Sequence, residues 1–149
     1  MTSYFYKNYQ MHLPITVQTT VEASPEKCWN CWTSPSDIVQ FNNPFADWHT
    51  SKVEIDLKEG GRFFYRMESI DGTNGFDFAG KYDKLILYKL IEYTGDDGRK
   101  TITRFTADGS NTTVTEIFEP DTVTPLEIQR NFCQGILDNF KKHMAPINH

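Results

Sequence analysis

Hydrophobic and polar positions alternate through the middle of the chain, from residue 51 to residue 118. Their period of two is that of a β-strand, in which successive side chains point to opposite faces. Turn sequences interrupt the alternation at Glu59-Gly60-Gly61, Asp71-Gly72, Gly95-Asp96-Asp97-Gly98 and Asp108-Gly109-Ser110. Six strands fit between these turns, at 51–57, 62–70, 76–85, 88–93, 100–107 and 112–118. Because Asp-Gly turns typically join antiparallel neighbours, we expect one antiparallel sheet in sequence order.

The start of the chain predicts one further strand and two short helices. Residues 14–22, PITVQTTVE, are β-branched and alternating, which places Ile15, Val17, Thr19 and Val21 on one face. Ser24 is a good N-cap and Pro25 suits the first helical position, so a helix is expected to begin there. Ser34-Pro35-Ser36 ends this helix and begins a second, which carries Ile38, Val39 and Phe41.

The end of the chain has a helical period instead. After Thr124-Pro125, apolar residues recur every four positions, at Ile128, Phe132, Ile136 and Phe140. This pattern predicts an amphipathic helix of about 20 residues, or about 30 Å. A sheet and a helix that each have one apolar face pack together. We therefore expect an α+β helix-grip fold, a curved antiparallel sheet wrapped around a long C-terminal helix, in the order β-α-α-β6-α, with a cavity between them.

The stretch GFDFAGKY, residues 75–82, is the most informative of the strands. Phe76 and Phe78 share one face with Gly80 and Tyr82, whereas Asp77 points the other way. Arg66 lies in the neighbouring strand, so Asp77 and Arg66 are expected to face each other. The alternation favours the outer face for this ion pair over a role in orienting a polar ligand.

Composition and charge narrow the function classes. The 149 residues suit a single domain at 14–145, preceded by an N-terminal extension at 1–13. A net charge of −5 lacks the positive field that phosphate backbones attract, so nucleic acid is not expected as a partner. No apolar run approaches the ~20 residues of a membrane span. We expect a cytoplasmic monomer or homodimer whose aromatic residues, 14% of the chain, are packed or line a pocket.

The chain shows no clear catalytic or metal-binding motif. Cys28 and Cys31 form a C-x-x-C, but only Cys133 remains as a further thiol, and the motif does not follow a strand in a βαβ setting as in thioredoxins. Buried structural cysteines are therefore favoured. The histidines lack metal-ligand spacing, and no serine lies in a nucleophile elbow. No glycine-rich loop opens a helix that could bind a nucleotide. We therefore expect no metal and no cofactor, and we assign no catalytic residue.

Several short motifs carry a family resemblance in their order and spacing. They are Trp32-Thr33, Asp47-Trp48, Gly60-Gly61-Arg62-Phe63, Asp71-Gly72, Gly75-Phe76-Asp77-Phe78 with Gly80 and Tyr82, Ile91 and Tyr93, Asp97-Gly98-Arg99, Phe118-Glu119, and Ile136-Leu137 with Phe140. With them the chain resembles the START-like, or helix-grip (SRPBCC), superfamily. More narrowly, it resembles the family named after the C-terminal domain of the Hsp90 ATPase activator.

This resemblance implies the same curved sheet around the last helix and, in many relatives, a cavity for an apolar ligand. It does not imply one function, because relatives include lipid and polyketide binders, cyclases and a chaperone co-factor. The chain departs from many relatives at Phe132-Cys133, where they have Gly-Trp in the last helix. This departure bears on the expected shape of the pocket.

We predict that the protein binds a small hydrophobic or aromatic molecule, with Trp48, His49 or Tyr93 fixing its orientation. A solvated loop position is the plainer interpretation of His49, and an ordinary core is the plainer interpretation of the aromatics. The alternatives are an Hsp90 co-chaperone-like module, with an Hsp90-type chaperone as partner, and a cyclase or hydratase that uses His49, Tyr93 or a carboxylate. The predicted ligand-binding residues are Phe41, Trp48, Phe63, Tyr65, Met67, Phe76, Phe78, Tyr93, Phe105, Ile128, Phe132 and Ile136.

Overall fold

The computed structural model describes residues 13–146. Its elements, in chain order, are β1 (Ile15–Val21), α2 (Pro25–Trp32), α3 (Pro35–Phe41), β2 (Trp48–Ile55), β3 (Arg62–Ser69), β4 (Gly75–Ile86), β5 (Leu90–Gly95), β6 (Lys100–Asp108), β7 (Asn111–Phe118) and α4 (Leu126–Met144). The predicted order of strands and helices is therefore confirmed. Nearly all of the predicted N-terminal extension lies outside the described residues, and the domain limits stay a prediction.

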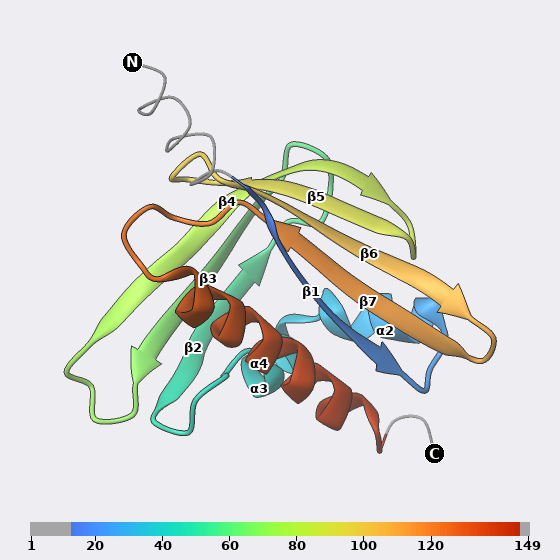
Figure 1. Ribbon diagram of the computed structural model, residues 1–149, viewed down its shortest axis with the longest axis horizontal. Helices are drawn as coiled ribbons and strands as arrows, with labels where there is room; N and C mark the ends of the chain where they lie inside the picture. Colours follow the sequence, from blue (N-terminus) through green and yellow to red (C-terminus); the bar gives the residue numbers. More distant parts are fainter. Residues whose placement is uncertain (1–12, 147–149) are drawn as a thin grey trace.

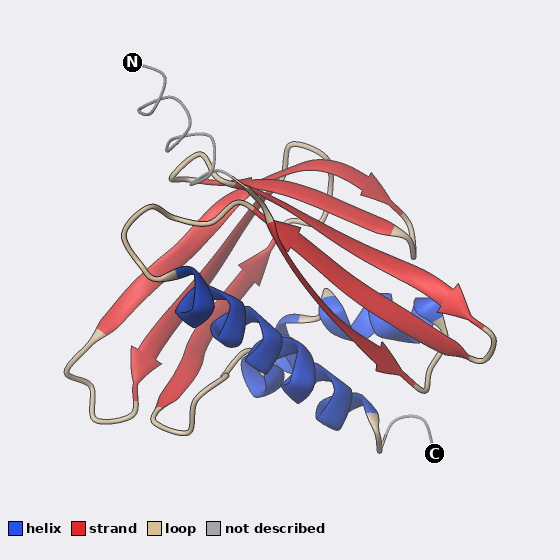
Figure 2. Ribbon diagram, viewed as in Figure 1, coloured by secondary structure: helices blue, strands red, loops and turns tan. Residues whose placement is uncertain are grey.

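One curved sheet forms the body of the molecule (Figure 1). Its seven strands lie in the order β1-β7-β6-β5-β4-β3-β2, and every neighbouring pair is antiparallel. The six later strands follow sequence order, as predicted, and β1 adds to the sheet beside β7. All three helices lie on the concave side (Figure 2). This is the helix-grip fold that the hydrophobic pattern predicts.

Local sequence explains where the elements begin and end. The Ser24 hydroxyl accepts a hydrogen bond from the Lys27 amide at 3.2 Å and so caps α2, with Pro25 in its first turn. The predicted Asp-Gly and Gly-Gly turns contain glycines at positive φ, at Gly60, Gly72, Gly98 and Gly109. The predicted strand at 88–93 begins too early, because Tyr88 has a φ of 64° in the turn before β5.

Gly80 in β4 makes room for an aromatic ring. A Cβ atom at this position would lie 2.5 Å from the Thr94 carbonyl oxygen and 2.7 Å from the Phe63 ring. Any larger residue would therefore push against backbone as well as side chain. Gly80 thus leaves room for the ring of Phe63 of β3 on the concave face.

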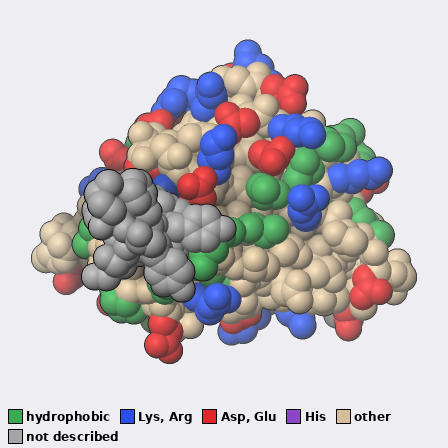
Figure 3. Space-filling view, turned by 45° about the horizontal axis from the view of Figure 1, so that its top comes forward, with side chains coloured by type: hydrophobic (Ala, Val, Ile, Leu, Met, Phe, Trp, Pro, Cys, Tyr) green, Lys and Arg blue, Asp and Glu red, His purple; other side chains and the backbone are tan. Residues whose placement is uncertain are grey.

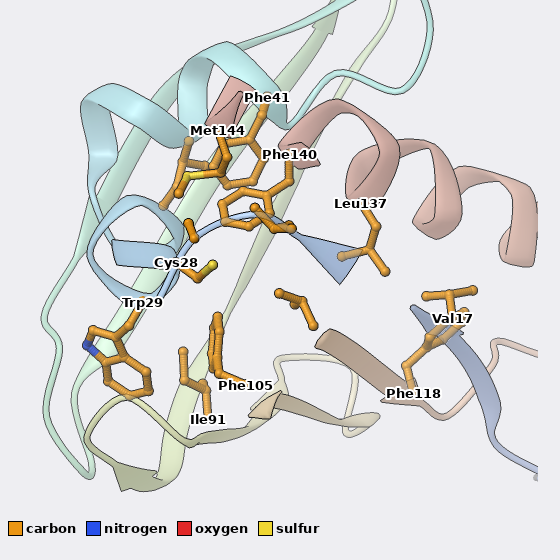
Figure 4. Packing of buried hydrophobic residues seen from close by; sticks show 14 of the residues in the cluster. Val17, Cys28, Trp29, Phe41, Ile91, Phe105, Phe118, Leu137, Phe140 and Met144 are labelled. Carbon is orange, nitrogen blue, oxygen red and sulfur yellow. The ribbon is translucent and has the colours of Figure 1, made fainter. Parts of the chain in front are cut away.

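The hydrophobic core fills one end of the space between sheet and helices (Figure 4). There α2 packs on β6 and β7, α3 packs on β2, and α4 packs on β1. Phe140 of α4 packs against Trp32 and Phe41 at ring distances of 5.1 and 5.0 Å. Phe140 and Met144 are fully buried. Cys28 of α2 is also fully buried. We call this region the packed end.

Helix α4 also covers the edge strand of the sheet. Its Arg130 guanidinium donates to the Thr16 carbonyl at 2.9 Å, and the Gln134 amide donates to the Gln18 carbonyl at 3.1 Å. These bonds satisfy carbonyl groups of β1 that no further strand pairs with. Helix α4 thus lies across the concave face of the sheet and is bonded to its edge (Figure 1).

The surface carries charges of both signs. On the face shown in Figure 3, basic and acidic side chains lie side by side. The predicted pair of Arg66 and Asp77 is confirmed on the outer face, with Arg66 Nη1 3.0 Å from Asp77 Oδ1. Within residues 13–146, no helix is both long and apolar enough to cross a membrane.

Candidate functional site

A cavity of about 380 Å³ lies between the first half of α4 and the concave face of strands β3 to β7. This volume falls in the range of small-molecule pockets. The predicted residues that line the cavity are Phe41, Phe63, Tyr65, Met67, Phe76, Phe78, Tyr93, Ile128, Phe132 and Ile136. The structure thus brings together side chains from α3, three strands and the C-terminal helix.

Rings from neighbouring strands form one wall of the cavity. Phe63 is at its centre, with ring centroids 4.8 Å from Tyr93, 5.3 Å from Phe78 and 5.3 Å from Tyr82. Tyr65 packs edge-on against Phe78 at 5.7 Å. The wall presents aromatic surface to the cavity.

Two predicted residues do not line the cavity. Phe105 is a core residue and packs against Trp29 and Trp32 at 5.6 and 6.2 Å. Trp48 lies at the start of β2 and contacts Phe76 at 5.8 Å from outside the cavity. The period-two pattern assigned each to a face of the sheet, but it does not say where along that face the cavity ends.

His49 does not lie in the cavity either. It is in β2, where its Nε2 atom is 3.8 Å from Glu68 Oε2 and nearly half of its side chain is exposed. The solvated interpretation of this histidine therefore describes its position better than a role at the pocket mouth. Of the three residues expected to orient a ligand, only Tyr93 lines the cavity.

The opposite wall is the first half of α4, which Gln129 holds in place. The buried Gln129 side chain accepts from the Asp121 amide at 2.9 Å and donates to the Thr124 carbonyl at 2.7 Å. This clamp ties the helix to the loop before it. Its neighbours Ile128, Phe132 and Cys133 then face the sheet across the cavity.

A carboxylate lies inside this otherwise mainly apolar space. Glu116 of β7 lines the cavity, and its Oε2 atom accepts a hydrogen bond from the Thr103 hydroxyl at 3.1 Å. The side chain is only partly accessible. Burial raises its pKa from 4.5 to about 7, although the hydrogen bond from Thr103 lowers it. Glu116 therefore changes its charge near neutral pH.

The tyrosine and cysteine side chains near Glu116 stay neutral at that pH. Burial raises the pKa of the Tyr65 and Tyr93 hydroxyls and of the Cys133 thiol well above their ordinary values. The negative charge of Glu116 raises these pKa values further. Glu116 thus titrates near pH 7 beside two tyrosines and a cysteine that keep their protons.

Charged side chains at the rim pair with one another. Arg99 donates from Nε to Asp97 Oδ2 at 2.7 Å and from Nη1 to the Glu119 carbonyl at 3.3 Å. Apolar lining residues are exposed at the rim as well, with Phe76 at 44% and Ile128 at 54%. The cavity is therefore open to solvent beside the start of α4.

Metal and thiol chemistry find little support in the geometry. Among the described residues, no group of three or more His, Cys, Asp or Glu side chains is placed to hold a metal ion. Burial raises the pKa of the Cys28 thiol to about 11, so the reactive thiolate of the C-x-x-C is scarce at neutral pH.

Comparison with known proteins places the chain in a family. The model of the family described as "Activator of Hsp90 ATPase homolog 1-like protein" matches residues 22–144. The chain belongs to this family. The predicted resemblance is thereby confirmed. No curated protein matches the chain.

Solved structures of similar proteins share the fold. The AHSA1-like protein from Aeromonas hydrophila is 33% identical, with a TM-score of 0.84 over 91% of this chain and 94% of that one. A protein from Cytophaga hutchinsonii is 37% identical, with a TM-score of 0.75 over 93% and 96%. A protein from Nitrosomonas europaea, at 17% identity over 91% and 96%, has a TM-score of 0.78 and supports the fold alone.

In this AHSA1-like chain, sequence reasoning missed the polar part of the cavity. Glu116 was not among the predicted residues, and neither were Thr103, Tyr82 and Gln129. A signal for Glu116 was present, since it alternates with Val114 and Phe118, both of which are buried. A carboxylate at an inward position of a strand is a candidate site residue.

Proposed function

We propose that the protein binds a small, mainly apolar or aromatic molecule in the cavity between α4 and the sheet. The observation that supports this most is the aromatic wall around Phe63, which faces a cavity of about 380 Å³ instead of packing against the helix. A ligand that buries the apolar lining would gain about 25 cal/mol for each Å² removed from water. Family membership supports the fold of the container but does not choose the ligand.

The test is a ligand screen by thermal shift and native mass spectrometry, with medium-chain fatty acids, naphthalene derivatives and aromatic polyketides. A ligand at 100 times its Kd should stabilise the folded chain by about 2.7 kcal/mol, which is several degrees in Tm for a domain of this size. An absence of binding across the whole panel would contradict the proposal.

A blocking variant shows whether binding uses this cavity. Cys133→Phe adds a ring that points from α4 into the open space, so it should fold and lose the ligand-induced shift. Cys133→Ala leaves the cavity open and should keep the shift. If both variants bind the ligand as the wild type does, the ligand lies elsewhere.

The same variants distinguish the alternative roles from ligand binding. Stimulation of Hsp90 ATPase turnover by the wild type and by Cys133→Phe alike would favour a chaperone-associated role, because that activity would not need the cavity. Glu116 is a titratable group inside the cavity, so an acid–base enzyme remains the other alternative. Conversion of a bound probe, followed by mass, would distinguish an enzyme from a passive binder.

A further inference from the structure

Glu116 has more hydrogen-bonding capacity than its surroundings use. An ionised carboxylate accepts about four hydrogen bonds, and the described residues give Glu116 one, from the Thr103 hydroxyl. A charge that is shielded from bulk water is costly unless it is paired. The free capacity of this carboxylate is directed at the cavity, because Glu116 is one of its lining residues.

The described residues offer Glu116 no cationic partner. From β6 it faces the Thr103 hydroxyl, from β3 and β5 the neutral Tyr65 and Tyr93 hydroxyls, and from α4 the neutral Cys133 thiol. The nearest basic residue that lines the cavity is Arg99, at the rim. Its guanidinium is already bound to Asp97 and to the Glu119 carbonyl.

The wall beside this carboxylate is aromatic. Phe63, Phe78 and Tyr93 form a continuous cluster of rings, with the closest centroids 4.8 Å apart. The face of an aromatic ring attracts a cation, and the attraction grows where water is excluded. A carboxylate together with several aromatic rings is therefore suited to an ammonium group, whereas an anionic ligand would meet an uncompensated like charge.

We propose that the cavity selects amines, with the protonated amino group of the ligand bound to Glu116 and its apolar body between the aromatic wall and α4. This inference rests on the proposed function, because it names the class of ligand for the same cavity. It adds a polar requirement that the apolar residues alone do not predict.

The sign of the pH dependence follows from the charges. An alkylamine stays protonated from pH 6 to pH 8, as a lysine side chain does. Glu116, with a pKa of about 7, is mostly neutral at pH 6 and mostly ionised at pH 8. The ionised fraction rises about tenfold between these values, so amine affinity should rise by up to about tenfold over this interval.

The experiment compares three probes of one shape by isothermal titration calorimetry at pH 6 and pH 8. They are 2-(2-naphthyl)ethylamine, 2-(2-naphthyl)ethanol and 2-naphthylacetate. At pH 8 the wild type should bind the amine at least tenfold more tightly than the alcohol. At pH 6 this ratio of affinities should be smaller. The acetate should bind most weakly of the three. Glu116→Gln should lose most of the preference for the amine over the alcohol, and the preference that remains should be the same at pH 6 and pH 8.

Glu92→Gln is the matched control, since Glu92 lies in β5 between two cavity residues but does not line the cavity. It should retain the preference of the wild type. Circular dichroism and Tm establish that both variants are folded. If Glu116→Gln does not fold, the pH dependence of the wild type for amine against alcohol still decides the matter.

Two further outcomes separate this inference from the proposed function. If the alcohol binds as tightly as the amine at pH 8, the amine selectivity is wrong and the binding function stands. If none of the three probes binds while other apolar ligands do, the amine selectivity is again wrong. Failure of every ligand, in this experiment and in the screen, would overturn both.

Discussion

The two halves of α4 lie on the same sheet and have opposite surroundings. In the second half, Leu137, Phe140 and Met144 are fully buried against the sheet and the two short helices. In the first half, Gln129 is the buried residue, and Ile128 is more than half exposed although it belongs to the same apolar stripe. The second half of α4 thus packs in the hydrophobic core, and the first half covers the cavity.

The difference lies in what fills the space beneath the helix. At the packed end, α2 and α3 place Cys28, Trp32 and Phe41 between α4 and the sheet. No such layer lies beneath the first half of α4 in the described part of the chain, so the rings of β3 to β5 face the cavity instead. An apolar stripe on a helix therefore predicts that it faces the sheet, but not whether side chains or a ligand fill the space between them.

The largest expected effect distinguishes the two halves by stability. Phe140→Ala should lower the free energy of unfolding by about 3 to 5 kcal/mol, because it leaves a cavity among fully packed rings. Phe132→Ala, on the partly exposed roof of the cavity, should cost less than about 1.5 kcal/mol. Urea unfolding of both variants measures the difference, and equal losses would show that the two halves are packed alike.

The next largest effect is the change of stability with pH that the carboxylate of Glu116 in the cavity causes. Because folding raises the pKa of Glu116 from 4.5 to about 7, the folded state binds more protons in this window, so stability falls as pH rises from about 4.5 to about 7. The variant Glu116→Gln should not lose stability in this way, because glutamine does not ionise. Relative to the wild type it should gain stability over that window, by on the order of 3 kcal/mol at most. Unfolding at pH 4.5, 6 and 8 tests this, and parallel pH profiles would contradict it.

Two cysteine-to-phenylalanine variants compare the packed end with the cavity, because each adds the volume of a ring to one of them. Cys28→Phe inserts a ring at a fully buried position of the packed end and should cost about 1 to 3 kcal/mol or more. Cys133→Phe places the same ring in the cavity and should cost less. Comparable losses of Tm in the two variants would mean that the cavity has no room for a phenyl group.

The smallest effect is expected outside both halves. Asp77→Asn removes the charge that pairs with Arg66 on the outer face of the sheet. Exposed ion pairs contribute little, so Tm and ligand binding should both remain unchanged. A loss of binding would mean that a change on the outer face alters ligand affinity in the cavity. The contacts of Arg66 and Asp77 give no reason to expect this.

Most of the fold could be predicted because each element has its own local signal. Alternation placed the strands, glycine turns placed the hairpins, and Ser24-Pro25 placed the start of α2. The turn at Tyr88 was missed because a tyrosine at positive φ has no sequence signal of the kind that glycine supplies.

The candidate site could be predicted only in part, for a physical reason. Alternation tells which face a residue takes, so Phe63 and Phe78 were found, but the position of the cavity along the face depends on where α2 and α3 pack. Phe105 was therefore assigned to the cavity although it belongs to the core. The role of Glu116 could not be predicted from apolar positions alone, because it is an inward carboxylate whose partner Thr103 comes from another strand.

The most direct test of the central claim is a two-dimensional ¹H–¹⁵N NMR titration of the full chain with a ligand from the screen. Saturable shifts should concentrate at the amides of Phe63, Phe78, Glu116 and Phe132, while those of Phe140 and Met144 stay in place. Shifts confined to the packed end, or spread over the outer face of the sheet, would contradict the claim that the open half of the helix grip is a binding site.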